Sequence, residues 1–384
     1  MAGFRPEISS LKRIVVKLGS SAVTRDRGGI NRAALQMLCA DIAWLHGQGI
    51  EVVLVSSGAI HAGRALLPPK AKSDEEEPID YLQACSAVGQ PVLMHAYSEL
   101  FATAGMKVAQ VLLTHDDFAN RVRNINARNT LLQLLQQNVL PILNENDSVS
   151  YREITVGDND QLAAMAAAMI NADLLLMLTT PDGVYDKDPT EGDAKHFPNV
   201  PVADQLKQLK LSTKSGAGRG GMRTKLYAVR KMVPIGIPVV IATHKSLAAE
   251  RCPGPNAIKR ALTETVGTYF EAATRDVAKN ERDFWLLTTA KFHFAIHVDE
   301  GAFKALGRSA SLLPKGVISA KGDFKRGDCV AVVYKGEPVA VGLVEYDCDE
   351  VNKIAGKNAS EIEGILGHYH ADSVILGKNL ARRK

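Results

Sequence analysis

The sequence has few aromatic residues, little net charge and no long apolar run, and each absence excludes a class of protein. Aromatic residues make up 5% of the 384 residues, so Ala, Val, Leu and Ile must build most of the core. The 46 Lys and Arg nearly balance the 42 Asp and Glu, which removes any argument for nucleic-acid or membrane binding from bulk charge. No apolar stretch reaches the roughly 18 residues of a membrane helix. Hydrophobic residues, at 46%, exclude a mainly disordered chain, and the length suggests two or three domains.

Cysteine is also scarce, and its spacing fits no disulfide framework. The odd number and the absence of a C-x-x-C pair argue against both structural disulfides and a Cys-rich zinc site. The first ten residues lack the apolar core of a secretory signal. We therefore expect a reducing, cytoplasmic compartment and no membrane partner. The five cysteines are Cys39, Cys85, Cys252, Cys329 and Cys348.

Short apolar runs alternate with amphipathic segments over roughly the first 245 residues. The runs are rich in Val, Ile and Leu without polar alternation, which is typical of strands buried on both faces. This alternation predicts an α/β domain with a mainly parallel sheet and helices on both faces, a three-layer sandwich. The expected strands are 14–16, 52–55, 108–113, 139–143, 174–178 and 239–242. The expected helices are 32–46, 81–103, 127–137, 159–171 and 223–232.

From about residue 281 the pattern changes to short β-prone runs. We expect a larger α/β domain over 10–265, a linker over 266–284 and a small β-rich domain over 285–384. The sequence Lys335-Gly336-Glu337-Pro338 predicts a hairpin turn in the second domain. The expected strands there are 285–287, 292–298, 330–334 and 339–344, with helices at 302–308 and 360–366.

The residues that follow four of the apolar runs are chemically unusual. Ligands of parallel sheets bind beyond the carboxyl ends of the strands, so these junctions are where a site is expected. Glycines, hydroxyls, amides, acids and a lysine replace ordinary turn residues there. The four junctions are Lys17-Leu18-Gly19-Ser20-Ser21, Ser56-Ser57-Gly58, Asn144-Glu145-Asn146-Asp147 and Thr179-Thr180.

Each candidate has a structural alternative. Lys17 can meet a phosphate oxygen beside a close-approaching glycine, or it can be an ordinary lysine at a strand end. The small-residue loop over 57–63 can bind an anion through backbone N–H groups, or it can be a tight turn. In Gly157-Asp158-Asn159-Asp160, one aspartate can cap the following helix, but two flanking an asparagine exceed what a cap needs.

The segment 215–225 is the richest in glycine. Gly216, Gly218 and Gly221 match G-x-G-x-x-G, but no apolar strand precedes them, so a dinucleotide site is not supported. What remains is either a surface loop or a phosphate-binding loop that leads Lys225 into the first turn of a helix. Two separated lysines and two Gly/Ser loops at one sheet edge favour phosphoryl transfer between cations. No H-E-x-x-H or Walker A pattern is present.

Taken together and in this order, these segments resemble the amino acid kinase family, and in particular its glutamate-phosphorylating branch. The tail resembles the PUA domain through the segments 307–317 and 360–367. The matching segments of the larger domain are V-V-K-L-G-S-S (15–21), V-S-S-G-A-I-H-A-G (55–63), A-V-G-Q (87–90), N-A-R-N-T-L (126–131), P-I-L-N-E-N-D (141–147), V-G-D-N-D-Q-L (156–162) and G-G-M-R-T-K (220–225).

The resemblance implies ATP-dependent phosphorylation of the γ-carboxylate of L-glutamate, with Mg²⁺ carried mainly by the phosphates and no protein cage for the metal. It implies that Lys17 and Lys225 neutralise the transferring phosphoryl group and that Asp160 holds both lysines. Asp147 would take the α-ammonium group of glutamate. The implied glutamate site comprises Ser57, Gly58, Asn144, Asp147, Asp158 and Asn159. The implied ATP site comprises Lys17, Gly19, Ser20, Thr179, Thr180, Arg219, Gly220, Gly221, Met222, Arg223, Thr224 and Lys225.

Two departures from the family pattern concern the nucleotide contacts. Thr180 stands where the family often has Asp, although Asp182 follows closely, and Arg219 stands where Thr is common. The resemblance further implies a homo-oligomer and feedback inhibition by proline, and it leaves open a transfer of the product to glutamate-5-semialdehyde dehydrogenase.

Two alternatives remain. One is another activity of the same family, on acetylglutamate, aspartate or UMP. The other is RNA binding through the PUA-like domain, whose 15 basic and 13 acidic residues over 282–384 give a weak charge of +2. The basic end of that domain consists of Lys378, Arg382, Arg383 and Lys384.

Overall fold

The chain forms two compact units, Met1–Ala273 and Thr274–Lys384. Each unit has its own sheet and its own apolar core. The computed structural model describes residues 5–25, 28–68, 77–150, 159–187, 192–200, 221–246, 249–253, 256–264, 266–272, 286, 291–306 and 310–382.

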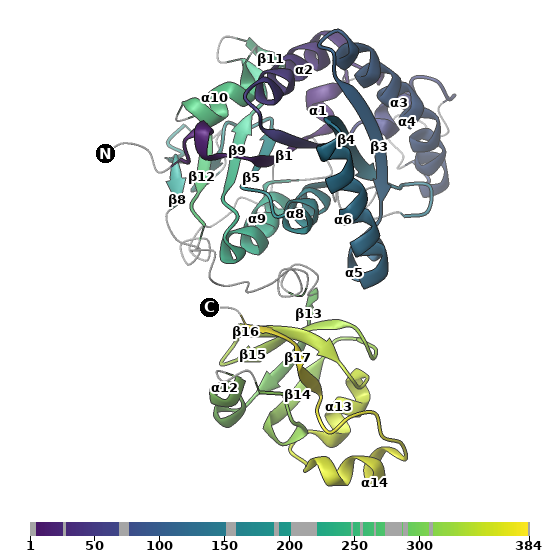
Figure 1. Ribbon diagram of the computed structural model, residues 1–384, viewed down its shortest axis with the longest axis vertical. Helices are drawn as coiled ribbons and strands as arrows, with labels where there is room; N and C mark the ends of the chain where they lie inside the picture. Colours follow the sequence, from purple (N-terminus) through teal and green to yellow (C-terminus); the bar gives the residue numbers. More distant parts are fainter. Residues whose placement is uncertain are drawn as a thin grey trace. The chain divides into compact units, whose positions relative to one another are not determined.

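The first unit is built on a sheet that has eight strands within these described ranges (Figure 1). Its order is β3-β4-β2-β1-β5-β9-β12-β8, and every pairing from β3 to β9 is parallel. All six predicted strands are confirmed, and so is the mainly parallel sheet. The bounds are β1 (Arg13–Leu18), β2 (Glu51–Ser56), β3 (Lys107–Leu113), β4 (Val139–Glu145), β5 (Leu174–Thr179), β8 (Asn199–Val200), β9 (Val239–Thr243) and β12 (Thr268–Phe270).

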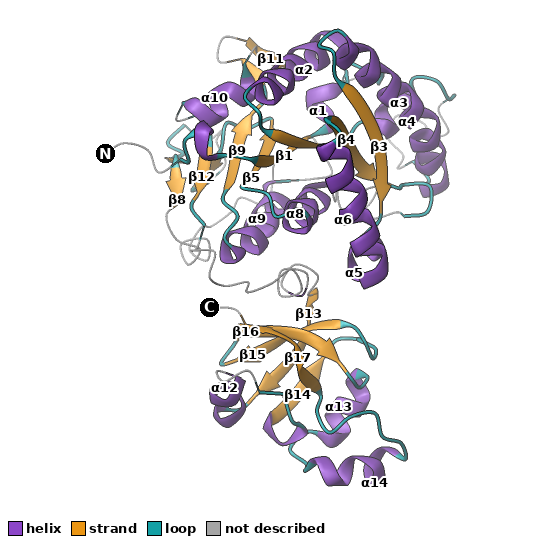
Figure 2. Ribbon diagram, viewed as in Figure 1, coloured by secondary structure: helices purple, strands orange, loops and turns teal. Residues whose placement is uncertain are grey.

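Helices cover both faces of this sheet, with α2 and α10 on one side and α8 and α9 on the other (Figure 2). The five predicted helices are confirmed, although the helix expected over 127–137 begins earlier. It begins after Asn120, whose side chain accepts from the backbone N–H groups of Val122 and Arg123. The bounds are α1 (Ser20–Val23), α2 (Arg32–Gly47), α3 (Ala59–Arg64), α4 (Ile79–Ala102), α5 (His115–Ala119), α6 (Arg121–Gln136), α8 (Asn159–Met169), α9 (Met222–Met232) and α10 (Ala257–Thr263). Short elements are η1 (Ile8–Ser10), β6 (Val184–Tyr185), β7 (His196–Phe197), η3 (Val233–Ile235), β10 (Lys245–Ser246) and β11 (Ala249–Pro253).

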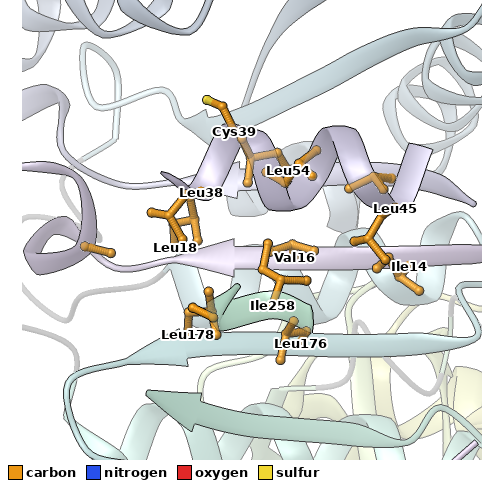
Figure 3. Close-up of a cluster of buried hydrophobic side chains, with 14 of the residues drawn as sticks. Ile14, Val16, Leu18, Leu38, Cys39, Leu45, Leu54, Leu176, Leu178 and Ile258 are labelled. Atoms are coloured by element: carbon orange, nitrogen blue, oxygen red, sulfur yellow. The ribbon is translucent and has the colours of Figure 1, made fainter. Parts of the chain in front are cut away.

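The central strand β1 shows how the two faces are divided. Leu38 of α2 lies over Leu18 and Leu45 lies over Ile14, and all four side chains are fully buried (Figure 3). Side chains alternate along a strand, so Ile14, Val16 and Leu18 belong to the α2 face and Lys17 belongs to the opposite face. On that face α8 packs against β1 and β5, and α9 packs against α8. The alternation of side chains along β1 therefore directs the charged side chain of Lys17 from the centre of the sheet toward α8.

The second unit contains a sheet of five strands, counted over its described residues, in the order β14-β13-β15-β16-β17. Its hairpin turn is confirmed, because Lys335 and Gly336 both have positive φ between β15 and β16. The strand expected at 285–287 is wrong at Leu286, which is helical, and its neighbours lie outside the described residues. The bounds are β13 (Lys291–Val298), α12 (Glu300–Leu306), η5 (Pro314–Gly316), β14 (Val317–Lys321), β15 (Cys329–Tyr334), β16 (Glu337–Val344), α13 (Cys348–Ile354), η6 (Ala359–Glu361), α14 (Ile362–Leu366) and β17 (Ile375–Arg382).

Strands β14 and β17 were not expected from the sequence, because Val317–Lys321 mixes exposed and buried positions and the apolar residues of Ile375–Arg382 are interrupted by Gly377, Lys378 and Asn379. They complete the sheet on either side of the predicted strands. In the part of the chain that is described, no helix combines the length and the apolarity needed to cross a membrane.

Candidate active site

The strand order brings the four chemically unusual junctions to one edge of the sheet. Strands β4, β2, β1 and β5 are direct neighbours and run parallel, so the residues at their carboxyl ends lie side by side. The backbone N–H of Ser57, which follows β2, donates to the carbonyl of Leu18 at the end of β1 over 3.1 Å. The predicted clustering of the junctions is therefore confirmed by the topology.

Two lysines from distant parts of the sequence meet one carboxylate at this edge. Lys17 Nζ lies 2.8 Å from Oδ1 of Asp160, and Lys225 Nζ lies 3.1 Å from Oδ2 of the same side chain. The hydroxyl of Thr224 also donates to Oδ2 over 2.6 Å. Asp160 stands in the first turn of α8, while Thr224 and Lys225 stand in the first turn of α9. Helix packing thus places the predicted lysine pair on a shared acid.

The cluster is buried and carries more positive than negative charge. Lys17, Lys225 and Asp160 are 5%, 4% and 0% exposed, so two ammonium groups share one carboxylate away from water. Burial by itself would raise the pKa of Asp160, but the charges of Lys17 and Lys225 and the hydrogen bonds to the carboxylate outweigh it and lower the pKa to about 2. Two buried ammonium groups beside one carboxylate favour an anionic ligand.

A chain of buried amide and hydroxyl groups lies on the other side of Asp160. Asn159 Nδ2 donates to Ser57 Oγ over 2.7 Å and to Asn144 Oδ1 over 2.9 Å. Asn144 Nδ2 in turn donates to Oε1 of Gln90 over 2.9 Å. These four residues come from α8, the end of β2, β4 and α4, and each is at least nine-tenths buried. Three residues predicted for the glutamate site are therefore linked, because Asn159 donates a hydrogen bond to both Ser57 and Asn144.

Asp147 offers an unused acceptor in the same region. Its Oδ2 accepts from the hydroxyl of Ser86 over 2.7 Å, while Oδ1 is buried and has no hydrogen-bond partner among the residues described. Burial raises the pKa of Asp147 to about 6, against the lowering effect of the Ser86 hydrogen bond. A buried carboxylate with one unsatisfied oxygen is suited to an ammonium group, which supplies both the charge and the donor.

The end of β5 lies beside the loop that follows β1. The hydroxyls of Thr180 and Ser21 are 3.3 Å apart, and Ser21 Oγ is also 3.3 Å from Nε2 of His244 at the end of β9. Burial lowers the pKa of His244 to about 4, so this imidazole is neutral at pH 7. Thr179 and Thr180 thus lie at the same edge as Gly19 and Ser20, as predicted for the nucleotide side.

The glycine segment is described only in part. Gly221 is the N-cap residue of α9, and Met222, Arg223, Thr224 and Lys225 form its first turn. Asp158, Arg219 and Gly220, predicted to contact glutamate or ATP, lie outside the described residues.

Sequence reasoning missed Ser86, Gln90, Ser21 and His244. Helix α4 reaches the site because two glycines allow its backbone to touch that of α3. A Cβ atom on Gly89 would lie 1.9 Å from the carbonyl oxygen of Ala59, and one on Gly63 would lie 1.8 Å from that of Cys85. The available signal was the pair of polar residues at positions 86 and 90, one helical turn apart on an otherwise apolar helix face.

A protein-held metal does not fit the donor set that is described. No group of three or more His, Cys, Asp or Glu side chains in the described ranges is placed to hold a metal ion. Asp160 already pairs with two lysines, so its oxygens are not available as ligands. We derive no step through a protein-bound cation.

Comparison with known proteins gives consistent matches over nearly the whole chain. Residues 12–243 match the amino acid kinase family, and residues 294–366 match the PUA domain. The chain is 40% identical to the glutamate 5-kinase of Trichlorobacter lovleyi, with 97% of each chain covered. It is 41% identical to that of Citrifermentans bemidjiense, with 97% of this chain and 98% of the relative covered. A solved UMP kinase from Bacillus anthracis matches 69% of this chain and 97% of its own at 15% identity and a TM-score of 0.47.

Proposed function

Since the chain belongs to the amino acid kinase family, we propose that it transfers the γ-phosphoryl group of ATP to the γ-carboxylate of L-glutamate, as the first step of proline biosynthesis. The products are glutamyl 5-phosphate and ADP. The observation that carries the proposal is the meeting of Lys17 and Lys225 on Asp160, at the sheet edge where Asp147 keeps an unsatisfied carboxylate oxygen. The first feature suits a phosphoryl group and the second suits the ammonium group of an amino acid.

The chemistry requires little covalent work from the protein. A γ-carboxylate with a pKa of about 4.3 is ionised at pH 7, so the nucleophile needs no general base. One of its oxygens forms a bond to the γ-phosphorus, the bond from phosphorus to the β,γ-bridging oxygen breaks, and ADP leaves with the electron pair. The obstacle is repulsion between the carboxylate and the phosphates. Two buried ammonium groups reduce it, because both can face the transferring group from fixed positions.

On the glutamate side, Asp147 takes the α-ammonium group and the chain of Ser57, Asn159 and Asn144 lines the remainder. Gly58 has φ of +117°, and a Cβ atom there would lie 2.8 Å from Val23, so glycine keeps the turn after Ser57 open. These roles rest on the unsatisfied Oδ1 of Asp147 and on the burial of Ser57, Asn159 and Asn144.

On the nucleotide side, Gly19, Ser20, Thr179, Thr180 and the start of α9 surround the lysines, and we assign them to ATP. Arg219 and Gly220 keep the role that the resemblance gives them. Magnesium enters as the MgATP complex, bound to the phosphates as part of the substrate.

The wider setting follows the resemblance. We propose a cytoplasmic enzyme, which agrees with Cys39, Cys85 and Cys348 being free, buried thiols. We also propose a homo-oligomer that is inhibited by proline and that passes its product to glutamate-5-semialdehyde dehydrogenase.

The proposed activity is tested by ADP release in a coupled assay with MgATP and a panel of acceptors. We expect turnover with L-glutamate and less than about 1% of that rate with N-acetylglutamate, L-aspartate or UMP. N-acetylglutamate and UMP have no free ammonium group for the buried acid, and the side chain of L-aspartate is one methylene too short to bring its carboxylate to the lysines. A preference for any of the other three acceptors would contradict the proposal.

A second prediction concerns the acid limb of the pH profile. Because burial raises the pKa of Asp147 to about 6, its carboxylate is protonated below that pH and loses its attraction for the ammonium group. We expect KM for L-glutamate to rise about tenfold for each pH unit below 6, while kcat changes less. The carboxyl groups of glutamate itself titrate at lower pH. Initial rates between pH 5 and 8 provide the measurement.

Two variants serve as controls for this profile. Asp147→Asn should bind glutamate weakly at every pH and should lose the acid limb of KM. Asp41 also has a pKa raised to about 6 by burial, but it accepts from the backbone N–H of Ile258 at the start of α10. Asp41→Asn should therefore keep the limb, and loss of the limb in that variant would exclude Asp147 as its origin.

A further inference from the structure

Helix α4 directs two polar side chains at the loop that follows β4. Ser86 and Gln90 are one helical turn apart, which places them on the same face of the helix. Ser86 contacts Asp147 and Gln90 contacts Asn144, at 2.7 and 2.9 Å. The sequence analysis gave neither helix residue a role. Both are buried, at 4% and 7% exposure.

The orientation of the Gln90 amide follows from a backbone group. The N–H of Glu145 donates to one atom of the Asn144 side chain over 3.0 Å, and a backbone N–H can only donate. That atom must therefore be the oxygen Oδ1, so the other atom, which meets Gln90, is the nitrogen Nδ2. A nitrogen that donates requires an acceptor, and the atom of Gln90 in contact is Oε1.

It follows that Nε2 of Gln90 is directed away from Asn144 with two N–H groups. Nε2 donates no hydrogen bond to any described residue. Among the described residues Nε2 is not one of the fully enclosed polar atoms, so a ligand can reach it, and a donor in a largely buried site gains free energy by meeting an acceptor. The neighbouring unsatisfied group is an acceptor, Oδ1 of Asp147. The donor, on Gln90, lies one turn of α4 after Ser86, which contacts Asp147. The acceptor, on Asp147, lies three residues after Asn144, which contacts Gln90.

We propose that Gln90 is a substrate-binding residue whose Nε2 donates to the α-carboxylate of L-glutamate while Asp147 holds the α-ammonium. An α-amino acid presents a cation and an anion on one carbon atom, and it needs an acceptor and a donor at about the spacing of an i,i+4 pair, roughly 5–6 Å. The inference rests on the proposed function and adds the residue that distinguishes an α-carboxylate from a neutral group.

The test compares L-glutamate with L-isoglutamine, in which only the α-carboxylate is replaced by a carboxamide. Gln90→Glu keeps an oxygen that accepts from Asn144 but replaces the two donors by a negatively charged acceptor. We expect KM and the calorimetric Kd for L-glutamate to rise about 100-fold, while those for L-isoglutamine change less than about threefold, because its carboxamide can donate to the new carboxylate. KM for ATP should stay within about threefold of the parent value.

Controls separate this role from damage to the fold. Ala87→Glu places the same charge at an exposed position of the same helix and should leave both substrates unchanged. Gln90→Met removes donor and acceptor without adding charge, and should reduce the preference for L-glutamate about tenfold. Thermal melting verifies that each variant is folded.

The outcomes are distinct. A fall in the preference for L-glutamate over L-isoglutamine supports the proposal. An equal loss for both ligands, or an unchanged preference, overturns it and reduces Gln90 to a support for Asn144. If the parent protein shows no turnover of L-glutamate, the proposed function itself fails, and this result is independent of the Gln90 variants.

Discussion

Replacement of Lys17 or Lys225 by methionine is expected to lower kcat by at least about 1,000-fold, the effect of removing a cation that faces a transferring phosphoryl group. KM for L-glutamate should change far less, because Asp147 and the chain of Asn144 and Asn159 do not depend on either ammonium group. Either substitution therefore weakens the stabilisation of the transition state and leaves the binding of L-glutamate largely intact.

Both variants should remain folded. The parent cluster holds two ammonium groups and one carboxylate, so the loss of one lysine leaves Asp160 paired with the other lysine and with the hydroxyl of Thr224. Methionine fills nearly the same volume as the lysine stem, which avoids a large cavity. A melting temperature within a few degrees of the parent corresponds to a change of about 1 kcal/mol or less.

Single-turnover measurement of ADP release with saturating L-glutamate isolates the chemical step. Lys231→Met is the matched control, since Lys231 is a buried lysine on the same helix, α9, and its Nζ lies 5.1 Å from the ring of Tyr227. It should retain kcat within about threefold. Near-parent turnover in either Lys17→Met or Lys225→Met would exclude a role for that lysine in phosphoryl transfer.

Replacement of Asp160 by asparagine should have the largest effect on stability. It removes the only carboxylate that the described residues offer to two buried ammonium groups, and breaking a buried charge cluster in this way costs about 3–5 kcal/mol. The free energy of unfolding of a typical domain is about 5–15 kcal/mol, so the variant should lose a large part of it. Inorganic phosphate or pyrophosphate should restore some of this stability, because an anion can take the place of the missing carboxylate.

The effect of Asp160 should depend on pH in a defined direction. The folded-state pKa, lowered to about 2, lies below the unfolded value of about 4. The carboxylate therefore contributes stability that is fully present above pH 4 and is lost as the pH falls toward 2. The difference in unfolding free energy between the parent and Asp160→Asn should be constant from pH 7 to about pH 5 and should shrink below pH 4.

Urea unfolding at several pH values gives these differences. Asp193→Asn is the control, because Asp193 is 84% exposed and pairs with Lys187 at the surface. A pair of that kind contributes about 0–1 kcal/mol. If Asp160→Asn were as mild as Asp193→Asn, the two lysines would have to be neutralised by other groups, and Asp160 would not be their main counter-charge.

Much of the larger unit could be predicted from local sequence. The apolar runs became β1, β2, β3, β4, β5 and β9 because unbroken Val, Ile and Leu segments can be buried only in a sheet covered on both faces. Lys17 was singled out by its place at a strand end and Lys225 by the glycine-rich segment before it, while the role of Asp160 came from the family resemblance. The second unit was predicted less completely, because β14 and β17 pair through backbone groups and have weak side-chain patterns.

The sequence by itself determined which residues form strands and which polar and charged side chains stand at the ends of strands and helices, because periodicity and residue type are local properties. The tertiary structure alone decided which of them meet. The order β4-β2-β1-β5 brings together junctions that lie as far apart in the sequence as Lys17 and Thr180, and the period of two in β1 sends Lys17 to the face that α8 and α9 share. It also decided the part played by α4, since Gln90 reaches Asn144 only where Gly63 and Gly89 let two helix backbones touch. Such contacts join residues distant in sequence, and their geometry depends on packing that no local pattern records.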